Sequence, residues 1–492
     1  MPQLPAWLTL EHGLITAYLA TLLTLAMYGF HRSLLLFMYY KHRGNEPVES
    51  AFFPEDKMPF VTIQLPLFNE MYVAPRLLEA VAQVRYPKDR FEIQVLDDST
   101  DETQAMCKTK VEELRALGLN IEYIHRVDRT GFKAGALAHG LKTSKGELVL
   151  VFDADFIPAP DILERTVHFF TDENIGMVQV RWEHLNRDYS MLTEMEAMML
   201  DGHFVIEHTA RHRSGRFFNF NGTAGIWRRC SIDDAGGWSH DTLTEDMDLS
   251  YRAQLRGWKF VYLKDVVSPA ELPVEMNSFK SQQFRWAKGS IQVAKKMLPT
   301  IWRAKIPFGV KLEAFFHLTN NFAYPLLLML SILLLPNLLV RTAHGWREVL
   351  LIDLPLFFGT TLSIATFYIT SQREIHRDWR KTLRRLPLMM SLGIGLCINQ
   401  TRAVFEALLG STSGEFVRTP KHGIQRRFEG WTAKKYRSAK TLTPYVEVIF
   451  AAYFALATVM AVIAGHYVSI PFLALFFLGF SYVGVLSLHQ SR

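Results

Sequence analysis

Cysteine is scarce in this sequence, and its scarcity excludes two kinds of structural site. The 492 residues include only Cys107, Cys230 and Cys397, which are far apart and odd in number. Three such residues support neither a disulfide framework nor a cysteine-rich zinc site. The simpler inference is that the polar part of the chain lies in a reducing compartment such as the cytosol.

Two common nucleotide-binding loops are also missing. The sequence contains neither a Walker pattern nor the Gly-x-Gly-x-x-Gly pattern of dinucleotide enzymes. These absences argue against a P-loop NTPase and against a dinucleotide-dependent enzyme. The net charge is +6, and 49% of the residues are hydrophobic. Because lysine and arginine gather beside apolar runs, we expect a membrane surface as the partner, and no nucleic acid.

The first long apolar run lies near the start of the chain. Residues 14–30 carry no charge, and the run continues past Arg32 to a basic cluster at 41–43. A bilayer span requires about 20 apolar residues, which this segment provides. We predict that residues 1–43 form a signal-anchor helix with its amino end outside and its basic end inside.

Residues 44–311 show the alternation that is typical of an α/β domain. Helical stretches such as 73–84 separate short apolar segments that are rich in Val, Ile and Phe. The predicted strands are 60–65, 91–96, 121–124 and the run that begins at 148. This order predicts a mixed, mostly parallel sheet with helices on both faces.

Apolar runs dominate residues 312–492. The predicted spans are 315–339, 349–369, 446–464 and 468–488, which with the amino-terminal helix makes about five. Basic loops flank residues 386–409, and such loops stay in the cytosol. If 386–409 crossed the membrane, one basic loop would lie outside. We therefore predict an in-plane helix at 386–409 and a multi-pass protein of the cell membrane with a cytosolic α/β domain.

Asp153 and Asp155 follow the apolar run that begins at Leu148. Ligands bind outside the carboxyl ends of strands in open α/β sheets. Two carboxylates one residue apart can share Mg²⁺ or Mn²⁺ there, together with phosphate oxygens of a substrate. A strand end with two solvated acids is the simpler alternative, and the pair alone does not decide between them.

A nucleotide-sugar would use these acids and two further residues. Asp98, at the end of another predicted strand, could hydrogen-bond the nucleoside. Lys133 follows the flexible Gly131 and could contact a phosphate as a point charge. A divalent cation on Asp153 and Asp155 would then act as a Lewis acid on the leaving diphosphate.

Two helical segments contain candidates for the other half of a transfer reaction. Thr244 could cap a helix whose first turn contains Asp246, and that carboxylate could act as general base toward a hydroxyl. Acids at helix starts also simply complement the helix dipole. Further on, Arg285 offers a fork for phosphate and Trp286 a flat face for a sugar ring. A helix at the membrane interface would contain the same two residue types.

Taken together, these motifs resemble the membrane-embedded, processive family 2 glycosyltransferases. The likeness is nearest to the cellulose-synthase-like A and C branches, which comprise mannan and glucan synthases. It covers roughly residues 15–490. The matching motifs are Asp97-Asp98-Ser99-Thr100, Asp153-Ala154-Asp155, Thr244-Glu245-Asp246, the stretch Asn219–Gly225 and Gln282-Gln283-Phe284-Arg285-Trp286.

The resemblance implies a glycosyltransferase A-type domain inserted between transmembrane helices. It implies inverting transfer, with Asp246 as the base and Glu245 beside it in the catalytic motif. The donor would contact Asp98, Lys133, Asp153 and Arg285, with the metal on Asp153 and Asp155. The acceptor would contact Trp286, Gln282, Asn221 and Gly222. A loop at 411–443, with Phe416, Thr419 and Lys421, is similar to the gating loop of cellulose synthases.

The expected activity is elongation of a β-linked polysaccharide and its passage through the membrane, and accessory export subunits are compatible with it. A glucan made from UDP-glucose is favoured, with a mannan made from GDP-mannose as the alternative. A single transfer onto a lipid acceptor is a second enzymatic alternative. A channel or transporter with a degenerate cytosolic domain is a third. Fold-level likeness does not choose the sugar.

Overall fold

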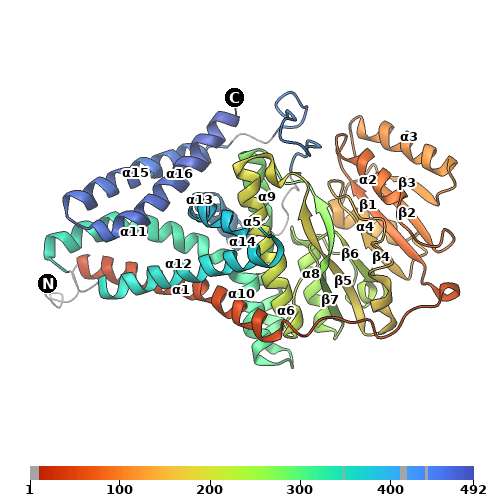
Figure 1. The fold of residues 1–492 in the computed structure, drawn as a ribbon, viewed down its shortest axis with the longest axis horizontal. Helices are drawn as coiled ribbons and strands as arrows, with labels where there is room; N and C mark the ends of the chain where they lie inside the picture. Colours follow the sequence, from red (N-terminus) through yellow and green to blue (C-terminus); the bar gives the residue numbers. More distant parts are fainter. Residues whose placement is uncertain (1–9, 347–349, 411–417, 438–440, 492) are drawn as a thin grey trace.

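The structure is a computed structural model that describes residues 10–346, 350–410, 418–437 and 441–491. Figure 1 shows two parts, a bundle of long helices and an α/β domain beside one end of that bundle. The mixed sheet and the flanking long helices confirm the fold class that the sequence predicts.

One seven-stranded sheet forms the centre of the α/β domain. Its strands are β1 (Val61–Leu67), β2 (Phe91–Asp97), β3 (Ile121–His125), β4 (Leu148–Val151), β5 (Ile175–His184), β6 (Gly225–Arg228) and β7 (Lys259–Ala270), in the order β3-β2-β1-β4-β6-β5-β7. The first four are parallel, whereas β6 is antiparallel to both of its neighbours. The carboxyl ends of β1, β2 and β4 therefore meet at one edge, and the chain segments that follow them are brought together there.

Each face of the sheet is covered by an apolar layer. Leu148 and Leu150 of β4 belong to the core on one face, and Val149 and Val151 belong to the core on the other. Because successive side chains of a strand point to opposite faces, a strand buried on both sides reads as an unbroken apolar run. The covering helices include α2 (Ala74–Ala82), α3 (Thr103–Ala116), α4 (Phe132–Leu141), α7 (Arg229–Asp234) and α8 (Glu245–Leu255).

Five helical segments among the described residues are long and apolar enough to cross a membrane. They are α1 (Leu10–His42), the joined α10 (Phe308–Thr319) and α11 (Ala323–His344), α12 (Leu350–Ile375), α15 (Thr443–Ile463) and α16 (Ile470–Gln490). Each of the five predicted spans therefore corresponds to one of these helical segments. The number becomes six if the bent pair α13 (Thr382–Gly395) and α14 (Cys397–Leu409) is counted as one span.

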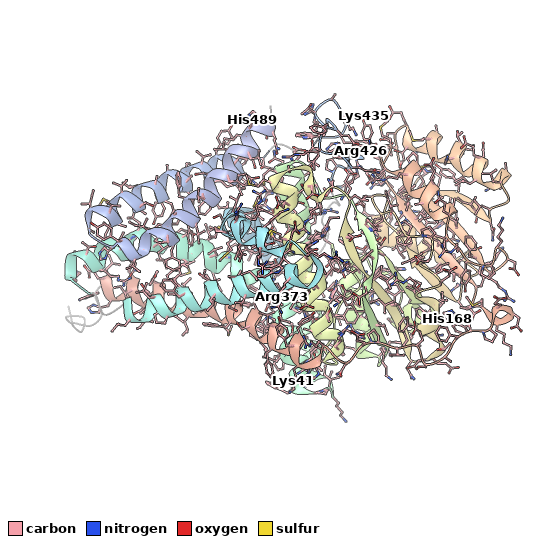
Figure 2. The ribbon with its side chains drawn as sticks, in the orientation of Figure 1. Lys41, His168, Arg373, Arg426, Lys435 and His489 are labelled. Atoms are coloured by element: carbon pink, nitrogen blue, oxygen red, sulfur yellow. The ribbon has the colours of Figure 1, made fainter. Side chains whose placement is uncertain are left out.

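Basic side chains gather where the bundle meets the α/β domain. Figure 2 labels Lys41, Arg373 and His489, from the last turns of α1, α12 and α16, in this boundary zone. Arg426 and Lys435 lie in the same zone on the loop after α14. This clustering at one end of the spans is the pattern on which the predicted topology depends.

The segment predicted as one helix at 386–409 is two helices, which meet at an angle of 41°. A close helix contact lies next to the bend. A Cβ atom on Gly395 would lie 2.4 Å from the carbonyl oxygen of Gly479 in α16, so the two backbones are in direct contact. Small residues permit such approaches between membrane helices. The predicted in-plane orientation of the segment stays a prediction.

Two long helical runs connect the sheet with the bundle. One consists of α5 (Met191–Asp201), the π-helical segment η4 (Gly202–His208) and α6 (Thr209–Arg213). The other is α9 (Met276–Arg303), which packs against α14. Lys288 of α9 pairs with Glu406 at 3.0 Å, and Asn399 donates to the carbonyl of Lys280 at 2.9 Å. The part of α9 that contains Gln282, Arg285 and Trp286 is thereby held against α14.

Candidate active site

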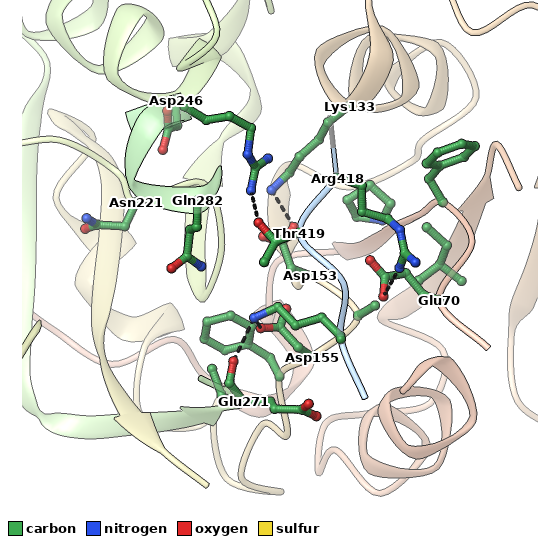
Figure 3. A pocket seen from close by; sticks show the side chains of 18 of the residues that line it. Glu70, Lys133, Asp153, Asp155, Asn221, Asp246, Glu271, Gln282, Arg418 and Thr419 are labelled. Atoms are coloured by element: carbon green, nitrogen blue, oxygen red, sulfur yellow. Dashed lines mark hydrogen bonds and ion pairs between the residues drawn. The ribbon is translucent and has the colours of Figure 1, made fainter. Parts of the chain in front are cut away.

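A cavity of about 200 Å³ opens at the carboxyl edge of the sheet, and Figure 3 shows it from close by. Most of the site residues predicted from the sequence line it. They are Asp98, Lys133, Asp153, Asp155, Asn221, Glu245, Asp246, Gln282, Arg285, Trp286, Thr419 and Lys421. Gly222 borders it as well, because a Cβ atom there would lie 3.1 Å from Oδ2 of Asp246. Phe416 lies outside the described residues.

Asp153 and Asp155 directly follow β4, as predicted, and each contacts a lysine. Lys133 Nζ contacts Oδ1 of Asp153 and donates to the carbonyl of Gly222 at 3.0 Å. Lys421 Nζ lies 2.6 Å from Oδ2 of Asp155. Burial raises the pKa of Asp153 although Lys133 opposes this shift. The two carboxylates are thus neutralised by ammonium groups from α4 and from the loop after α14.

The donor set at Asp153 and Asp155 fits a hard divalent cation. Their carboxylate oxygens are the ligand type that Mg²⁺ and Mn²⁺ prefer, and such ions are completed by substrate phosphates and water. Among the described residues, no group of three or more His, Cys, Asp or Glu side chains is close enough to hold a metal by itself. The protein therefore offers a two-carboxylate site that a diphosphate would have to complete.

Asp98 is buried at the end of β2 and is held by one arginine. Arg126 donates to both of its oxygens, from Nε at 2.8 Å and from Nη2 at 2.5 Å. This bidentate pairing fixes the plane of the carboxylate. The adjacent Asp97 accepts from Tyr123 at 2.7 Å and from the backbone of Ser99, so it organises the turn instead of facing the cavity.

Asp246 lies in the first turn of α8, where the sequence predicts the general base. The backbone N–H of Met247 donates to its Oδ1 at 2.8 Å. Burial and the neighbouring Glu245 raise the pKa of Asp246 to about 8. A carboxylate with a raised pKa is a stronger base, so this environment suits removal of a proton from a sugar hydroxyl.

The predicted capping role of Thr244 is only half right. Thr244 occupies the position before α8, but its hydroxyl makes no capping hydrogen bond. The side chain is buried against α9, where a Cβ atom on Gly289 would lie 2.5 Å from its Cγ2. Tertiary packing therefore fixes this threonine, and the helix start is satisfied in another way.

Gln282, Arg285 and Trp286 lie on one face of α9, since residues three and four apart are neighbours on a helix. All three line the cavity. Arg285 donates to the hydroxyl of Thr419 at 2.7 Å, which Figure 3 shows as a dashed line. Burial lowers the pKa of Arg285 to about 10, and the group stays cationic at neutral pH.

Several lining residues were not predicted from the sequence. Glu70, after β1, forms an ion pair with Arg418, with Oε2 and Nη1 3.0 Å apart, and burial raises the pKa of Glu70 to about 8. Glu271 accepts from the backbone N–H of His422 at 2.9 Å. The position of Glu70 could have been found by the rule that found Asp98, because both follow parallel strands. Its arginine partner is too distant in the sequence to be inferred.

A second cavity, of about 260 Å³, lies on the other side of Asp246 and Trp286. These two residues line both cavities, and so do Trp182, Asn221 and Gln282. Amide and imidazole groups make up much of its wall, namely His203, Gln283, His317, Asn320, Asn321 and Gln400. Charged side chains line it as well, namely Arg32, Glu196, Glu207 and Arg211. Asp246 is therefore at the junction of this second cavity and the first one.

The comparison with protein families identifies the α/β domain. The sequence model of the family described as "Glycosyltransferase like family 2" matches residues 59–289, which include the sheet and all four predicted acidic and aromatic motifs. Residues 59–289 form a family 2 glycosyltransferase domain. The resemblance inferred from the motifs is thereby confirmed, and the acids at the carboxyl edge belong to this glycosyltransferase domain.

Relatives with high sequence identity are plant enzymes. The chain is 46% identical over 252 residues to "Glucomannan 4-beta-mannosyltransferase 2" of Arabidopsis thaliana, which is 50% of this chain and 47% of the relative. It is 45% identical over 252 residues to "Glucomannan 4-beta-mannosyltransferase 1" of Oryza sativa subsp. japonica, or 50% and 48% of the two chains. The chain thus matches about half the length of these curated relatives.

Among solved structures, the glycosyltransferase fold recurs in "Mannosyltransferase PcManGT from Pyrobaculum calidifontis in complex with GDP-Man and Mn2+". The TM-score is 0.55 at 19% sequence identity, and the match covers 80% of this chain and 99% of that one. The likeness is one of fold.

Proposed function

We propose that this glycosyltransferase is an inverting β-mannan synthase that uses GDP-mannose and elongates its polymer processively. The observation that carries the proposal is the position of Asp246, at the junction of the first cavity and the second. A donor bound in one cavity and an acceptor hydroxyl bound in the other could then both lie next to this base.

The choice of sugar differs from the expectation drawn from the sequence, which favoured a glucan made from UDP-glucose. Relatives that are 45% and 46% identical carry the name glucomannan 4-beta-mannosyltransferase, and this supports the mannan alternative. The structural neighbour was solved with GDP-Man and Mn²⁺, which is compatible with the same donor class.

The arrangement of these residues supports a direct displacement of the nucleotide from the donor sugar by the acceptor hydroxyl. The diphosphate of the donor would lie among Lys133, Arg285 and the acids after β4. Asp246 would take the proton of an acceptor hydroxyl, whose oxygen then attacks the anomeric carbon on the face opposite the leaving nucleotide. An α-linked donor would give a β-linked product. A divalent cation bound to Asp153 and Asp155 would supply Lewis-acid stabilisation of the leaving diphosphate.

A series of cavities with lining residues in common supports passage of the product into the helical bundle. The second cavity shares Arg32, Met199 and Tyr324, among other residues, with a third cavity of about 250 Å³ between α1, α11, α12 and α16. That third cavity shares Phe357 and Phe472 with a fourth, toward the far end of the bundle. We propose that the growing chain follows this series while the catalytic domain stays cytosolic.

The test uses purified protein in nanodiscs with Mn²⁺ and, in parallel, radiolabelled GDP-mannose or UDP-glucose. We expect polymer from GDP-mannose alone, and we expect an endo-β-1,4-mannanase to digest it. The control is Asp246→Asn, which should bind GDP and make no polymer.

Two results would contradict the proposal in different ways. Polymer made only from UDP-glucose would restore the glucan expectation and leave the processive mechanism intact. Label found only in one short, lipid-extractable product would favour single transfer onto a lipid and remove the role of the bundle as a channel.

A further inference from the structure

A series of four hydrogen-bonded side chains borders the second cavity beside Asp246. His203 Nδ1 lies 3.1 Å from Oε2 of Glu207. His203 Nε2 lies 3.0 Å from Nδ2 of Asn221, whose Oδ1 lies 2.5 Å from Nε2 of His208. Glu207, His203 and His208 all belong to η4, whereas Asn221 belongs to the loop before β6. One amide is therefore held between two imidazoles.

The donor and the acceptor of each of these hydrogen bonds follow from the negative charge of Glu207, at one end of the series. Glu207 contacts Arg32 of α1 and also Arg211, at 3.1 Å, so it is a carboxylate and can only accept. His203 must then carry its proton on Nδ1 and accept at Nε2 from the amide N–H of Asn221. The amide oxygen consequently faces His208, which must donate from Nε2.

Two further observations agree with neutral imidazoles in these tautomers. His208 Nδ1, which would be the bare nitrogen, is buried without a hydrogen-bond partner in the part of the chain that the structure describes. Burial lowers the pKa of His208 to about 3 and holds the pKa of His203 well below its ordinary value. Neither ring therefore acquires a second proton near neutral pH, and the order of donors and acceptors is fixed.

The π-helical conformation of η4 is what places both rings on the amide. In an α-helix of 3.6 residues per turn, residues five apart point about 140° away from each other. A π-helical turn pairs residues i and i+5 instead. The ring centroids of His203 and His208 are accordingly only 4.3 Å apart. Such segments are often found at functional sites.

Asn221 keeps hydrogen-bonding capacity for a ligand. Its second Nδ2 hydrogen and the second lone pair of Oδ1 are not needed by the two histidines. The side chain lines both the first and the second cavity, and Figure 3 shows it on the same side of the site as Asp246. A Cβ atom on the next residue, Gly222, would lie 3.1 Å from Oδ2 of Asp246. A hydroxyl-bearing ligand at the base would be within reach of this amide.

We propose that His203, His208 and Glu207 are positioning residues that hold the Asn221 amide in one orientation, so that it binds a hydroxyl of the terminal acceptor sugar next to the hydroxyl that Asp246 deprotonates. This inference rests on the proposed function, because it requires a glycan acceptor at Asp246. Because Glu207 contacts Arg32, the same series of side chains connects helix α1 with the place where the terminal acceptor sugar would bind.

The test compares variants of the full-length protein in nanodiscs. His203→Leu removes the acceptor for the amide N–H, and His203→Gln restores an oxygen at that position. Asn221→Asp keeps the shape of the side chain but cannot donate. His212→Leu is the matched control, since His212 is a half-buried histidine of the same helical run and packs on Phe218. Each variant is assayed with GDP-mannose and β-1,4-mannotetraose, and in parallel with UDP-glucose and cellotetraose.

We expect His203→Leu and Asn221→Asp to raise the KM for the tetraose by about tenfold, the effect of losing one hydrogen bond. The KM for the donor and its slow hydrolysis by water should not change. His203→Gln should recover most of the loss, and His212→Leu should resemble the wild type. An unchanged tetraose KM in folded His203→Leu, or equal effects on donor and acceptor, would overturn the proposal.

A binding measurement separates this inference from the proposed function. If the wild type transfers neither sugar, the proposed function fails. Binding of either tetraose can still be followed by the fluorescence of Trp182 and Trp286, which line both cavities. Tetraose binding that weakens in His203→Leu and not in His212→Leu would then support the positioning role, and equal binding to all three proteins would refute it.

Discussion

At the scale of single residues, the site holds acidic and basic side chains close together in a buried environment. Asp246, Glu245 and Asp153 lie near Lys133, and the pKa of each of the three acids is raised mainly by burial and further by an acidic neighbour. The diphosphate of a donor would add negative charge to this site, and offsetting that charge is the role proposed for a divalent cation.

The role of Asp246 predicts a large and selective loss of activity. Asp246→Asn has nearly the same shape but cannot accept a proton, so we expect kcat for transfer to fall by about 10²–10⁴-fold. GDP affinity, measured by calorimetry with Mn²⁺, should stay close to that of the wild type. A variant that retains wild-type turnover would remove Asp246 as the base.

The same substitution should change stability in a pH-dependent way. The pKa of Asp246 is about 8 in the folded protein, against about 4 in an unfolded chain. The folded protein therefore keeps a proton that the unfolded chain releases, and the free energy of unfolding falls as the pH rises between these values. We expect the Tm of Asp246→Asn in detergent to exceed the wild-type Tm at pH 8 and to match it near pH 4. An equal difference at both pH values would contradict the raised pKa.

Lys421 is predicted to compete with the metal. Its ammonium group lies 2.6 Å from Oδ2 of Asp155, where a cation would bind. A unit charge at about 4 Å changes an interaction by about 1–4 kcal/mol between water and a protein surface. Lys421→Gln should therefore tighten Mn²⁺ binding in the presence of GDP by about tenfold or more, as measured from the free-ion signal in electron paramagnetic resonance. Lys435→Gln is the control, because Lys435 pairs with Glu102 on the surface.

Site residues could be predicted from the sequence where their position at a strand end or a helix start marks them. Residues whose place in the site depends on a partner far away in the sequence were missed. Asp98, Asp153 and Asp246 were found because strand ends and helix starts are visible locally. Glu70 and its partner Arg418 were missed, since their contact depends on the tertiary fold. Thr244 shows the opposite error, because packing against Gly289 overrides the capping role that its local position suggests.

At the scale of elements, alternating strands and helices were predictable because buried parallel strands read as short apolar runs. The antiparallel β6 was not, since it has only four residues and its pairing with β4 and β5 is non-local. The bend between α13 and α14 was not predictable for the same reason. It lies beside the contact of α13 with α16, which no local pattern shows.

That contact gives a prediction for the bundle. A Cβ atom on Gly395 would lie 2.4 Å from the backbone oxygen of Gly479, so Gly395→Ala must push α13 away from α16. We expect its Tm in detergent to fall by several degrees. Gly393→Ala is the matched control on the same helix, because a Cβ atom there meets nothing within 4 Å. It should be neutral or slightly stabilising, as alanine favours a helix over glycine. Equal changes of Tm in the two variants would show that the contact between α13 and α16 does not determine the stability of the bundle.

At the scale of the whole molecule, the direction of each long helix fixes which loops share a side. The α/β domain and the segments after α12 and α14 lie at one end of the bundle, and the turn between α15 and α16 lies at the other (Figure 1). If the bundle crosses the membrane with its basic end in the cytosol, a reagent that cannot cross should distinguish these two ends.

Two probes in the same molecule can test this orientation. Cys230 is exposed in the α/β domain, while Cys107 and Cys397 are buried. Tyr467, beside the turn between α15 and α16, is 65% exposed and can be replaced by cysteine. In sealed inside-out vesicles an impermeant maleimide should label Cys230 and not Tyr467→Cys, and in spheroplasts the pattern should reverse. Labelling of both positions from the same side would contradict the topology, and with it the proposal that the polymer travels from Asp246 through the bundle to the opposite face.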